Sequence, residues 1–163
     1  MPFFSNCSLS ALTALPILGA IVILLAGPNP KLARTLAALF SLAALLFTII
    51  LALHFDRSSS ALQFQERFNW VPTLHIEYRL AVDGLGILLL LLSAIVVPIG
   101  IAASWHIEDR AALYFALVLF LESCLFGCFT ALNFIHWFTF WELSIIPAFF
   151  LIKLWGGPRR TAA

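Results

Sequence analysis

Charged side chains are scarce in this sequence, and their scarcity decides the class of protein. Only 10% of the 163 residues are Asp, Glu, Lys or Arg, while 63% are hydrophobic. A soluble domain carries roughly 25% charged residues. The few charges are also clustered, which leaves several apolar runs close to the ~20 residues that cross a hydrocarbon core. The sequence therefore predicts an integral, multi-pass membrane protein.

The sequence also lacks the signatures of several soluble functions. The net charge is only +1 and no basic patch is interleaved with aromatic residues, so we expect no nucleic-acid partner. The three cysteines, Cys7, Cys124 and Cys128, match no zinc or redox spacing. No nucleophile–base motif, phosphate loop, dinucleotide fingerprint or haem-ligand pair is present. We therefore expect no metal and no cofactor in this chain.

The N-terminal apolar run lacks the basic residues that begin a signal peptide. No Lys or Arg precedes Lys31, whereas a signal peptide starts with a basic segment. We therefore expect an uncleaved first transmembrane helix, which contains Pro16 and ends at the turn Gly27-Pro28-Asn29-Pro30.

Five apolar segments are long enough to span a membrane as helices. They are predicted at residues 9–26, 32–53, 84–104, 111–132 and 134–155. Asp83 stands just before the third segment and is a typical residue for capping a helix N-terminus. The predicted fold class is all-α integral membrane, with five transmembrane helices in a single membrane domain, residues 1–163.

The loop at residues 55–82 has a different periodicity. Apolar residues occupy the even positions 62, 64, 68 and 70, and again every even position in residues 74–82, on either side of Val71-Pro72-Thr73. A period of two predicts two strands joined by a short connection, which form an extramembrane β-hairpin. One face would lie on the helices or on a neighbouring subunit. An irregular interfacial loop anchored by aromatic side chains is the alternative interpretation.

Lys and Arg are distributed unevenly between the two ends of the five predicted helices. One set of ends carries Lys31, Arg34, Arg110, Lys153, Arg159 and Arg160, and the other carries Arg57, Arg67 and Arg79. The cytoplasmic ends of membrane helices usually carry more Lys and Arg than the external ends. The sequence therefore predicts a cytoplasmic C-terminus, with the N-terminus and the 55–82 loop outside.

Two carboxylates, Glu122 and Glu142, lie inside predicted membrane-spanning segments. Both are about 14 Å from the short connection near Asn133, as judged from the rise of a helix. A carboxylate in lipid costs on the order of 2.5–3.5 kcal/mol on insertion scales, so each is a candidate for proton transfer. The spacing does not determine the rotation of either helix, so it does not show whether the two carboxylates face each other. The alternative is that both are protonated and hydrogen-bonded across helices.

Pro147 lies five residues after Glu142 and removes the backbone hydrogen bond to the carbonyl of Leu143. A free carbonyl beside a buried carboxylate is a place to bind water or a proton carrier, although prolines are also tolerated in membrane helices. No Lys or Arg lies in the middle of a predicted helix, and Lys153 is expected to reach the interface. We therefore expect the basic partner of Glu142 outside this sequence.

Several motifs resemble those of the antiporter-like subunits of respiratory complex I. The early ones are Val82-Asp83-Gly84-Leu85, and Leu121-Glu122 followed by Leu125-Phe126-Gly127. The fifth-helix signature of the M-type chain (subunit 4) of proton-pumping NADH:quinone oxidoreductase is similar to Phe140-Trp141-Glu142-Leu143, Ile146-Pro147 and Leu154-Trp155-Gly156-Gly157-Pro158-Arg159-Arg160. The pattern Phe68-Asn69-Trp70-Val71-Pro72 also fits that chain.

The resemblance implies a subunit of the membrane arm that contributes to proton translocation through a buried glutamate relay. It implies that Glu142 works with a lysine in a later helix, and that Glu122 matches a residue whose role is less well defined. NADH, FMN, iron–sulfur clusters and quinone would bind partner subunits. The other membrane-arm subunits would be the partners, partly through the outer hairpin, in a bacterial cell membrane.

The sequence ends at Ala163, whereas members of that family continue through further helices, including the one with the lysine. The resemblance therefore covers the N-terminal part of a member, and we expect a truncated reading frame, a fragment or a split subunit. Two other interpretations remain. One is a subunit of a multisubunit sodium/proton antiporter or a membrane-bound hydrogenase, and the other is a non-catalytic membrane scaffold.

Overall fold

Capping residues mark where the helices begin. The computed structural model describes residues 7–71, 73 and 76–157. Asn29, Asp83 and Asn133 accept hydrogen bonds from backbone N–H groups in the first turns of three helices. All helix bounds lie within two residues of the predicted ones. The elements are α1 (Ser8–Leu25), α2 (Pro30–His54), β1 (Gln63–Val71), β2 (Ile76–Val82), α3 (Gly84–Ala103), α4 (Ala111–Thr130) and α5 (Phe134–Trp155).

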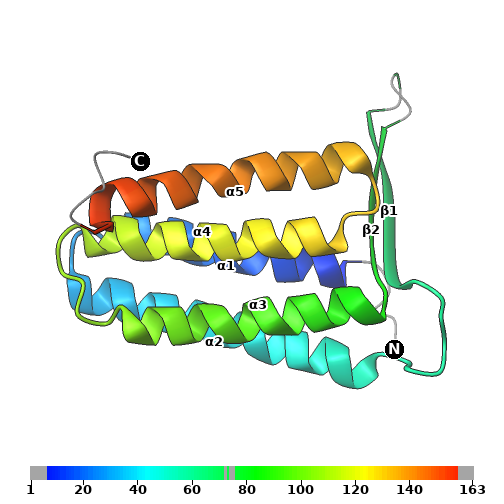
Figure 1. The fold of residues 1–163 in the computed structure, drawn as a ribbon, viewed down its shortest axis with the longest axis horizontal. Helices are drawn as coiled ribbons and strands as arrows, with labels where there is room; N and C mark the ends of the chain where they lie inside the picture. Colours follow the sequence, from blue (N-terminus) through cyan, green and yellow to red (C-terminus); the bar gives the residue numbers. More distant parts are fainter. Residues whose placement is uncertain (1–6, 72, 74–75, 158–163) are drawn as a thin grey trace.

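The helices lie side by side, and the hairpin stands across one end of them (Figure 1). Each of the five described helices has 18 to 25 residues and is apolar enough to cross a membrane. β1 and β2 pair antiparallel, with Arg67 opposite Arg79 and Phe68 opposite Tyr78. The predicted all-α membrane fold with one β-hairpin is confirmed, and the irregular loop is excluded.

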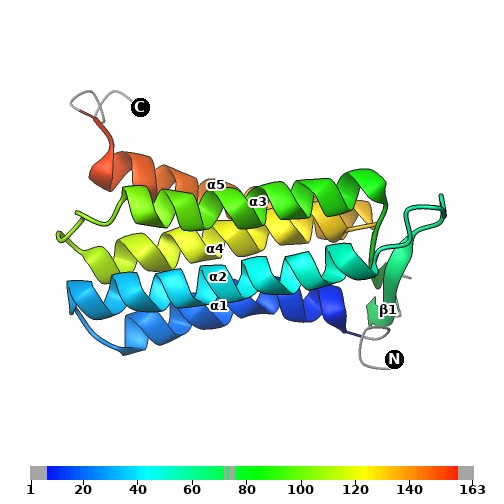
Figure 2. The ribbon, with the colours of Figure 1, turned by 90° about the horizontal axis from the view of Figure 1, so that it is seen from below.

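α4 forms the centre of the bundle and α5 its edge. α4 contacts each of the other four helices, while α5 packs mainly on α4. Figure 2 shows α4 with α3 on one side and α2 on the other. In the most apolar window of α5 only 11% of the residues are buried, against 28–44% in the other four helices. Most of α5 therefore faces away from the described part of the chain.

A small residue and a buried hydroxyl group let α1 approach its neighbours closely. Gly19 of α1 lies against Phe40 of α2 and Leu119 of α4, where a Cβ atom would overlap the Phe40 side chain. The buried Ser123 hydroxyl of α4 donates a 2.7 Å hydrogen bond to the carbonyl of Thr13 in α1. Small residues and interhelical hydrogen bonds are the usual means of helix association in membranes. They fix α1 against α2 and α4 here.

The predicted alternation is only partly present in β2, where Ala81 at an odd position is also buried (2% exposed), and it is interrupted in β1. Leu80 and Val82, at even positions of β2, are each 1% exposed. In β1 the register shifts just before Glu66, and Phe64 adopts a positive φ of 54°. Such bulges redirect the side chains of a strand. Phe68 is accordingly 48% exposed although its position is even.

Hydrogen bonds join β2 to the connection between α4 and α5. The Leu132 N–H donates to the carbonyl of Arg79 at 3.0 Å, and the Asn133 side chain donates to the carbonyl of Glu77 at 3.1 Å. The hairpin thereby fixes the point at which α5 starts.

On the exposed side of the hairpin, hydrogen bonds from Arg67 hold the pKa of the Glu77 carboxylate below its ordinary value.

Some residues that the sequence patterns include lie outside the described residues. Pro72 and Leu74 belong to the predicted connection and second strand, and Arg159 and Arg160 belong to the predicted cytoplasmic charges. The described strands agree with the predicted ones within two residues at each end.

Gly127 of α4 lies directly against the Phe140 ring of α5, because a Cβ atom there would overlap that ring. We predict that Gly127→Ala lowers the free energy of unfolding by about 1–3 kcal/mol, the usual cost of overpacking. Denaturant unfolding in a single detergent measures the change. Gly100→Ala in α3 is the matched control, since nothing lies within 4 Å of its Cβ position. Equal effects at both glycines would refute the close contact.

Candidate functional site

Glu122 lies in the fully buried interior of the helix bundle. Its own exposed fraction is 0%, as are those of Leu119, Ser123 and Phe126 on the same helix. Neither carboxylate oxygen has a hydrogen-bond partner among the described residues. The predicted alternative of a bond across helices is therefore not formed with any of them. A buried polar group of this kind is rare in proteins and requires an explanation.

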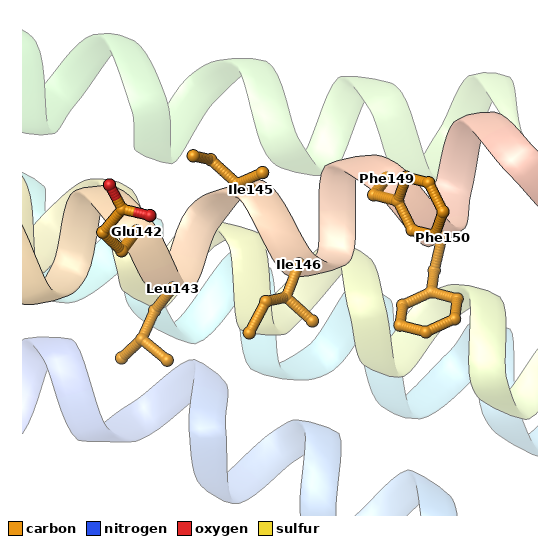
Figure 3. Close-up of a pocket in the computed structure, with 6 residues that line it drawn as sticks. All are labelled: Glu142, Leu143, Ile145, Ile146, Phe149 and Phe150. Carbon is orange, nitrogen blue, oxygen red and sulfur yellow. The ribbon is translucent and has the colours of Figure 1, made fainter. Parts of the chain in front are cut away.

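Packing sets the rotation of α5, and that rotation turns Glu142 outward. Phe140 rests on Gly127 of α4, and the buried residues of α5 are His136 and Pro147. Glu142 lies about 200° around the helix from Phe140, because each residue adds ~100°. It is exposed, on the side of α5 away from α4. It lines an open groove together with Leu143, Ile145, Ile146, Phe149 and Phe150, whose side chains are drawn in Figure 3.

The two carboxylates lie at one depth but do not form a pair. Glu122 lies eight residues before Thr130, the end of α4, and Glu142 lies eight residues after Phe134, the start of α5. Eight residues of helix rise about 12 Å, so the predicted common depth is present. One side chain is enclosed by the bundle and the other lies on its outer surface. Proton transfer by either carboxylate stays a prediction.

Positive charges lie near the ends of the helices and not beside these glutamates. Lys153, close to the end of α5, lies 5.1 Å above the ring centroid of Phe149. Within the described ranges, no Lys or Arg forms an ion pair with Glu122 or Glu142. The ion pairs found there are Arg34–Glu108, Arg67–Glu77 and Arg79–Glu77.

Pro147 and Glu142 lie on different faces of α5. Pro147 is buried and Glu142 is exposed. Leu143, whose carbonyl loses its helical hydrogen bond to Pro147, lines the groove beside Glu142. The helix continues through the proline without interruption. The binding of water or a proton carrier at this carbonyl stays a prediction.

The described cysteines are free thiols, with Cys7 exposed, Cys124 buried and Cys128 half-buried. Across the described part of the chain, no group of three His, Cys, Asp or Glu side chains is placed to hold a metal ion.

A further buried carboxylate, Glu66 of β1, is absent from the sequence-based candidates. It is 2% exposed and accepts hydrogen bonds from the N–H groups of Leu9 at 2.6 Å and Ser10 at 3.2 Å, and also from the Ser10 hydroxyl. It caps α1, because the first N–H groups of a helix lack helical partners and favour a negative charge. The signal in the sequence is its even position within residues 62–70.

The hairpin also covers the start of α5. His136 is 5% exposed, and its ring lies 4.6 Å from that of Tyr78 in β2 and 4.8 Å from that of Phe140, centroid to centroid. Its Nε2 atom has no hydrogen-bond partner among the described residues. Contacts with α4 and with the hairpin thus fix the rotation of α5 about its axis, and in this rotation Glu142 faces outward.

Three curated proteins are similar to this chain over nearly its whole length. It is 37% identical over 155 residues to F(420)H(2) dehydrogenase subunit M of Methanosarcina mazei. It is 38% identical over 156 residues to NAD(P)H-quinone oxidoreductase chain 4 1 of a Synechococcus strain, and 34% over 160 residues to NADH-quinone oxidoreductase subunit M of Rhodobacter capsulatus. Each match covers 94–95% of this chain and 30–31% of the relative. No family model matches the chain.

A solved structure has the same fold. A chain of respiratory complex I from Thermus thermophilus with bound NADH superposes with a TM-score of 0.80 and 25% identity, over 94% of this chain and 30% of that one. This chain is homologous to the M-type, or chain 4, subunits of NADH:quinone oxidoreductase. The resemblance predicted from the motifs is confirmed. The chain spans about a third of the length of the relatives it matches.

Two buried carboxylates of this M-type homologue should differ in how an apolar substitution changes the free energy of unfolding. Glu66 is fully hydrogen-bonded, whereas Glu122 has no described partner. We predict that Glu66→Met lowers the free energy of unfolding by about 2–3 kcal/mol, because N–H groups are left unpaired. Glu122→Met should cause no loss, or a gain of up to about 2 kcal/mol. Denaturant unfolding compares them, and a similar loss in both would show that Glu122 is paired.

Proposed function

We propose that this chain belongs to the membrane arm of an NADH:quinone oxidoreductase and contributes to proton translocation through Glu142 and Glu122. The named relatives and the complex I structure support the assembly. The two carboxylates at one depth inside spanning helices support the proton-transfer role, since ionisable residues at such depth mark ion and proton pathways.

The position of Glu142 carries this proposal. It stands on an otherwise apolar outer face of α5, with Ile145, Ile146 and Phe149 beside it. A carboxylate facing lipid there costs on the order of 2.5–3.5 kcal/mol. A protein surface that covers this face and brings a basic group to Glu142 removes that cost. Further membrane helices, in the same or another polypeptide, supply that surface in our proposal.

The two glutamates have different tasks in this scheme. Glu142 exchanges its proton with the basic group on the covering helices, because α5 directs it toward them. Glu122 lies at the same depth on the inner side of α4 and holds a proton within the bundle. An approaching positive charge favours the ionised carboxylate, and its withdrawal favours the protonated one. Alternation between these states moves protons in steps.

Electron transfer belongs to other subunits in this proposal. The relatives' names differ in the electron donor, F(420)H(2), NAD(P)H or NADH, while the M-type or chain 4 subunit is common to them. A shared subunit with different donors fits a role in proton movement rather than in donor oxidation. NADH, FMN, iron–sulfur clusters and quinone are accordingly assigned to partner subunits, and other membrane-arm subunits are the proposed contacts.

We favour this function over the alternatives because of the relatives' names. Those named above are quinone oxidoreductase or F(420)H(2) dehydrogenase subunits. An antiporter or hydrogenase subunit would share the glutamates but would not respond to NADH oxidation. A non-catalytic scaffold would tolerate the loss of both carboxylates.

We predict that Glu142→Gln lowers NADH-driven proton uptake into inverted membrane vesicles at least tenfold. Gln keeps the shape of the side chain but cannot ionise, so the relay is lost. Glu142→Asp should retain part of the uptake. Reduction of a soluble acceptor by NADH, which does not need the membrane arm, reports on the intact electron-input part of the complex.

Glu108→Gln is the matched control, because Glu108 is an exposed carboxylate at the end of the bundle. It should leave proton uptake unchanged. A native gel confirms that each variant is assembled. Normal uptake in assembled Glu142→Gln would exclude the relay and favour a scaffold.

We propose that the N-terminus and the 55–82 loop face the outside of a bacterial cell membrane, with the C-terminus in the cytoplasm. In a background without Cys7, Cys124 and Cys128, a cysteine at Ser59 should react with an impermeant maleimide added to intact cells. A cysteine at Glu108, at the opposite helix ends, should react only after lysis. The reverse pattern would invert the orientation.

A further inference from the structure

A second groove lies at the end of the bundle where the hairpin is attached. It runs between the end of α2, the loop that follows it and the start of α3, and it is distinct from the groove beside Glu142. It is lined by Ala52, Phe55, Arg57, Ser59, Ser60, Gly84, Ile87, Leu88 and Leu91. Because these helices end here, the groove straddles the boundary between membrane and water.

The loop side of this groove carries a cation and two hydroxyl groups. No described residue forms an ion pair or hydrogen bond with the Arg57 guanidinium, which is exposed. Ser59 and Ser60 line the same wall. Guanidinium and hydroxyl groups are the usual donors to phosphate oxygens. This wall therefore suits a phosphate group.

Two carboxylates stand near the groove but do not line it. Asp56 accepts hydrogen bonds from the N–H of Ser58 at 2.9 Å and its hydroxyl at 2.6 Å, which lower the pKa of Asp56. Asp83 accepts one from the N–H of Gly86 at 2.7 Å. Both carboxylates thus already accept hydrogen bonds from backbone N–H groups. Their charge disfavours an anionic headgroup and suits one that carries a positive group beside its phosphate.

The membrane side of the groove is apolar. Gly84, Ile87, Leu88 and Leu91 follow one face of α3 and extend about 10 Å along the helix from its start. Leu88 is 62% exposed, while Ile87 is 6% exposed and forms the floor. An acyl chain fits this surface, whereas a free phosphate ion would use only the loop wall.

We infer that this groove binds a zwitterionic glycerophospholipid, with the phosphate at Arg57 and an acyl chain along Leu88 and Leu91. Charge complementarity on one wall and an apolar track on the other, joined at the membrane boundary, support this occupant. The bound lipid fills the space between the 55–62 loop and α3, and so holds the loop that leads into the hairpin against the bundle. This inference does not depend on the proposed proton transfer.

The test uses phosphatidylethanolamine with a photoreactive acyl chain, added to membranes that contain the chain with its natural partners. Crosslinked peptides are identified by mass spectrometry. We expect labelling of residues 84–91 that excess inorganic phosphate does not reduce. Arg57→Gln should reduce it about tenfold, the effect of one charge-assisted contact. Leu88→Trp, which fills the track, should reduce it similarly.

Two matched controls separate a site from general lipid contact. Arg79→Gln changes an arginine of the hairpin whose side chain is 47% exposed. Leu92→Trp changes a neighbouring leucine that is 58% exposed but does not line the groove. In both variants, crosslinking of the lipid to residues 84–91 should equal that in the unsubstituted protein. Labelling that is insensitive to Arg57→Gln and Leu88→Trp overturns the inference. Crosslinks to another polypeptide, protection by inorganic phosphate, or preference for phosphatidylglycerol overturn it as well.

Discussion

A polar group inside a membrane needs a partner from the protein, because lipid tails offer none. Most buried hydroxyl groups here follow this constraint by bonding to carbonyls of their own helices. Ser123 bonds to a neighbouring helix instead, and Glu66 reaches from the hairpin to the start of α1. Glu122 and Glu142 stand apart: one is enclosed without a described partner, and the other lies on an apolar outer face.

The contrast between the two glutamates follows from the place of their helices. α4 is surrounded by the other four helices, so a residue turned inward from it is enclosed by this chain. α5 rests mainly on α4, and Phe140 on Gly127 fixes which side is inward. The side that carries Glu142 is then turned away from α4 and is exposed. No described Lys or Arg forms an ion pair with it.

Several contacts between the hairpin and the helices lie at one end of the bundle. β2 bonds to the α4–α5 connection, Tyr78 covers His136, and Glu66 caps α1. One small sheet thus positions the starts of two helices that are far apart in the sequence. The loop that leads into it carries Arg57 beside an apolar track on α3. The chain therefore has polar contacts at the membrane boundary that a helix bundle alone would lack.

The sequence by itself determined the five spanning helices and the common depth of Glu122 and Glu142, and it favoured the hairpin over an irregular loop. These depend on local features: apolar length, a period of two, capping residues and helical rise. Only the tertiary structure decided which carboxylate is enclosed, that Glu66 caps α1, and that Arg57 shares a groove with Leu88. Helices that are apolar on every side do not reveal their rotation. It is set by contacts such as Phe140 on Gly127, which join residues from different helices.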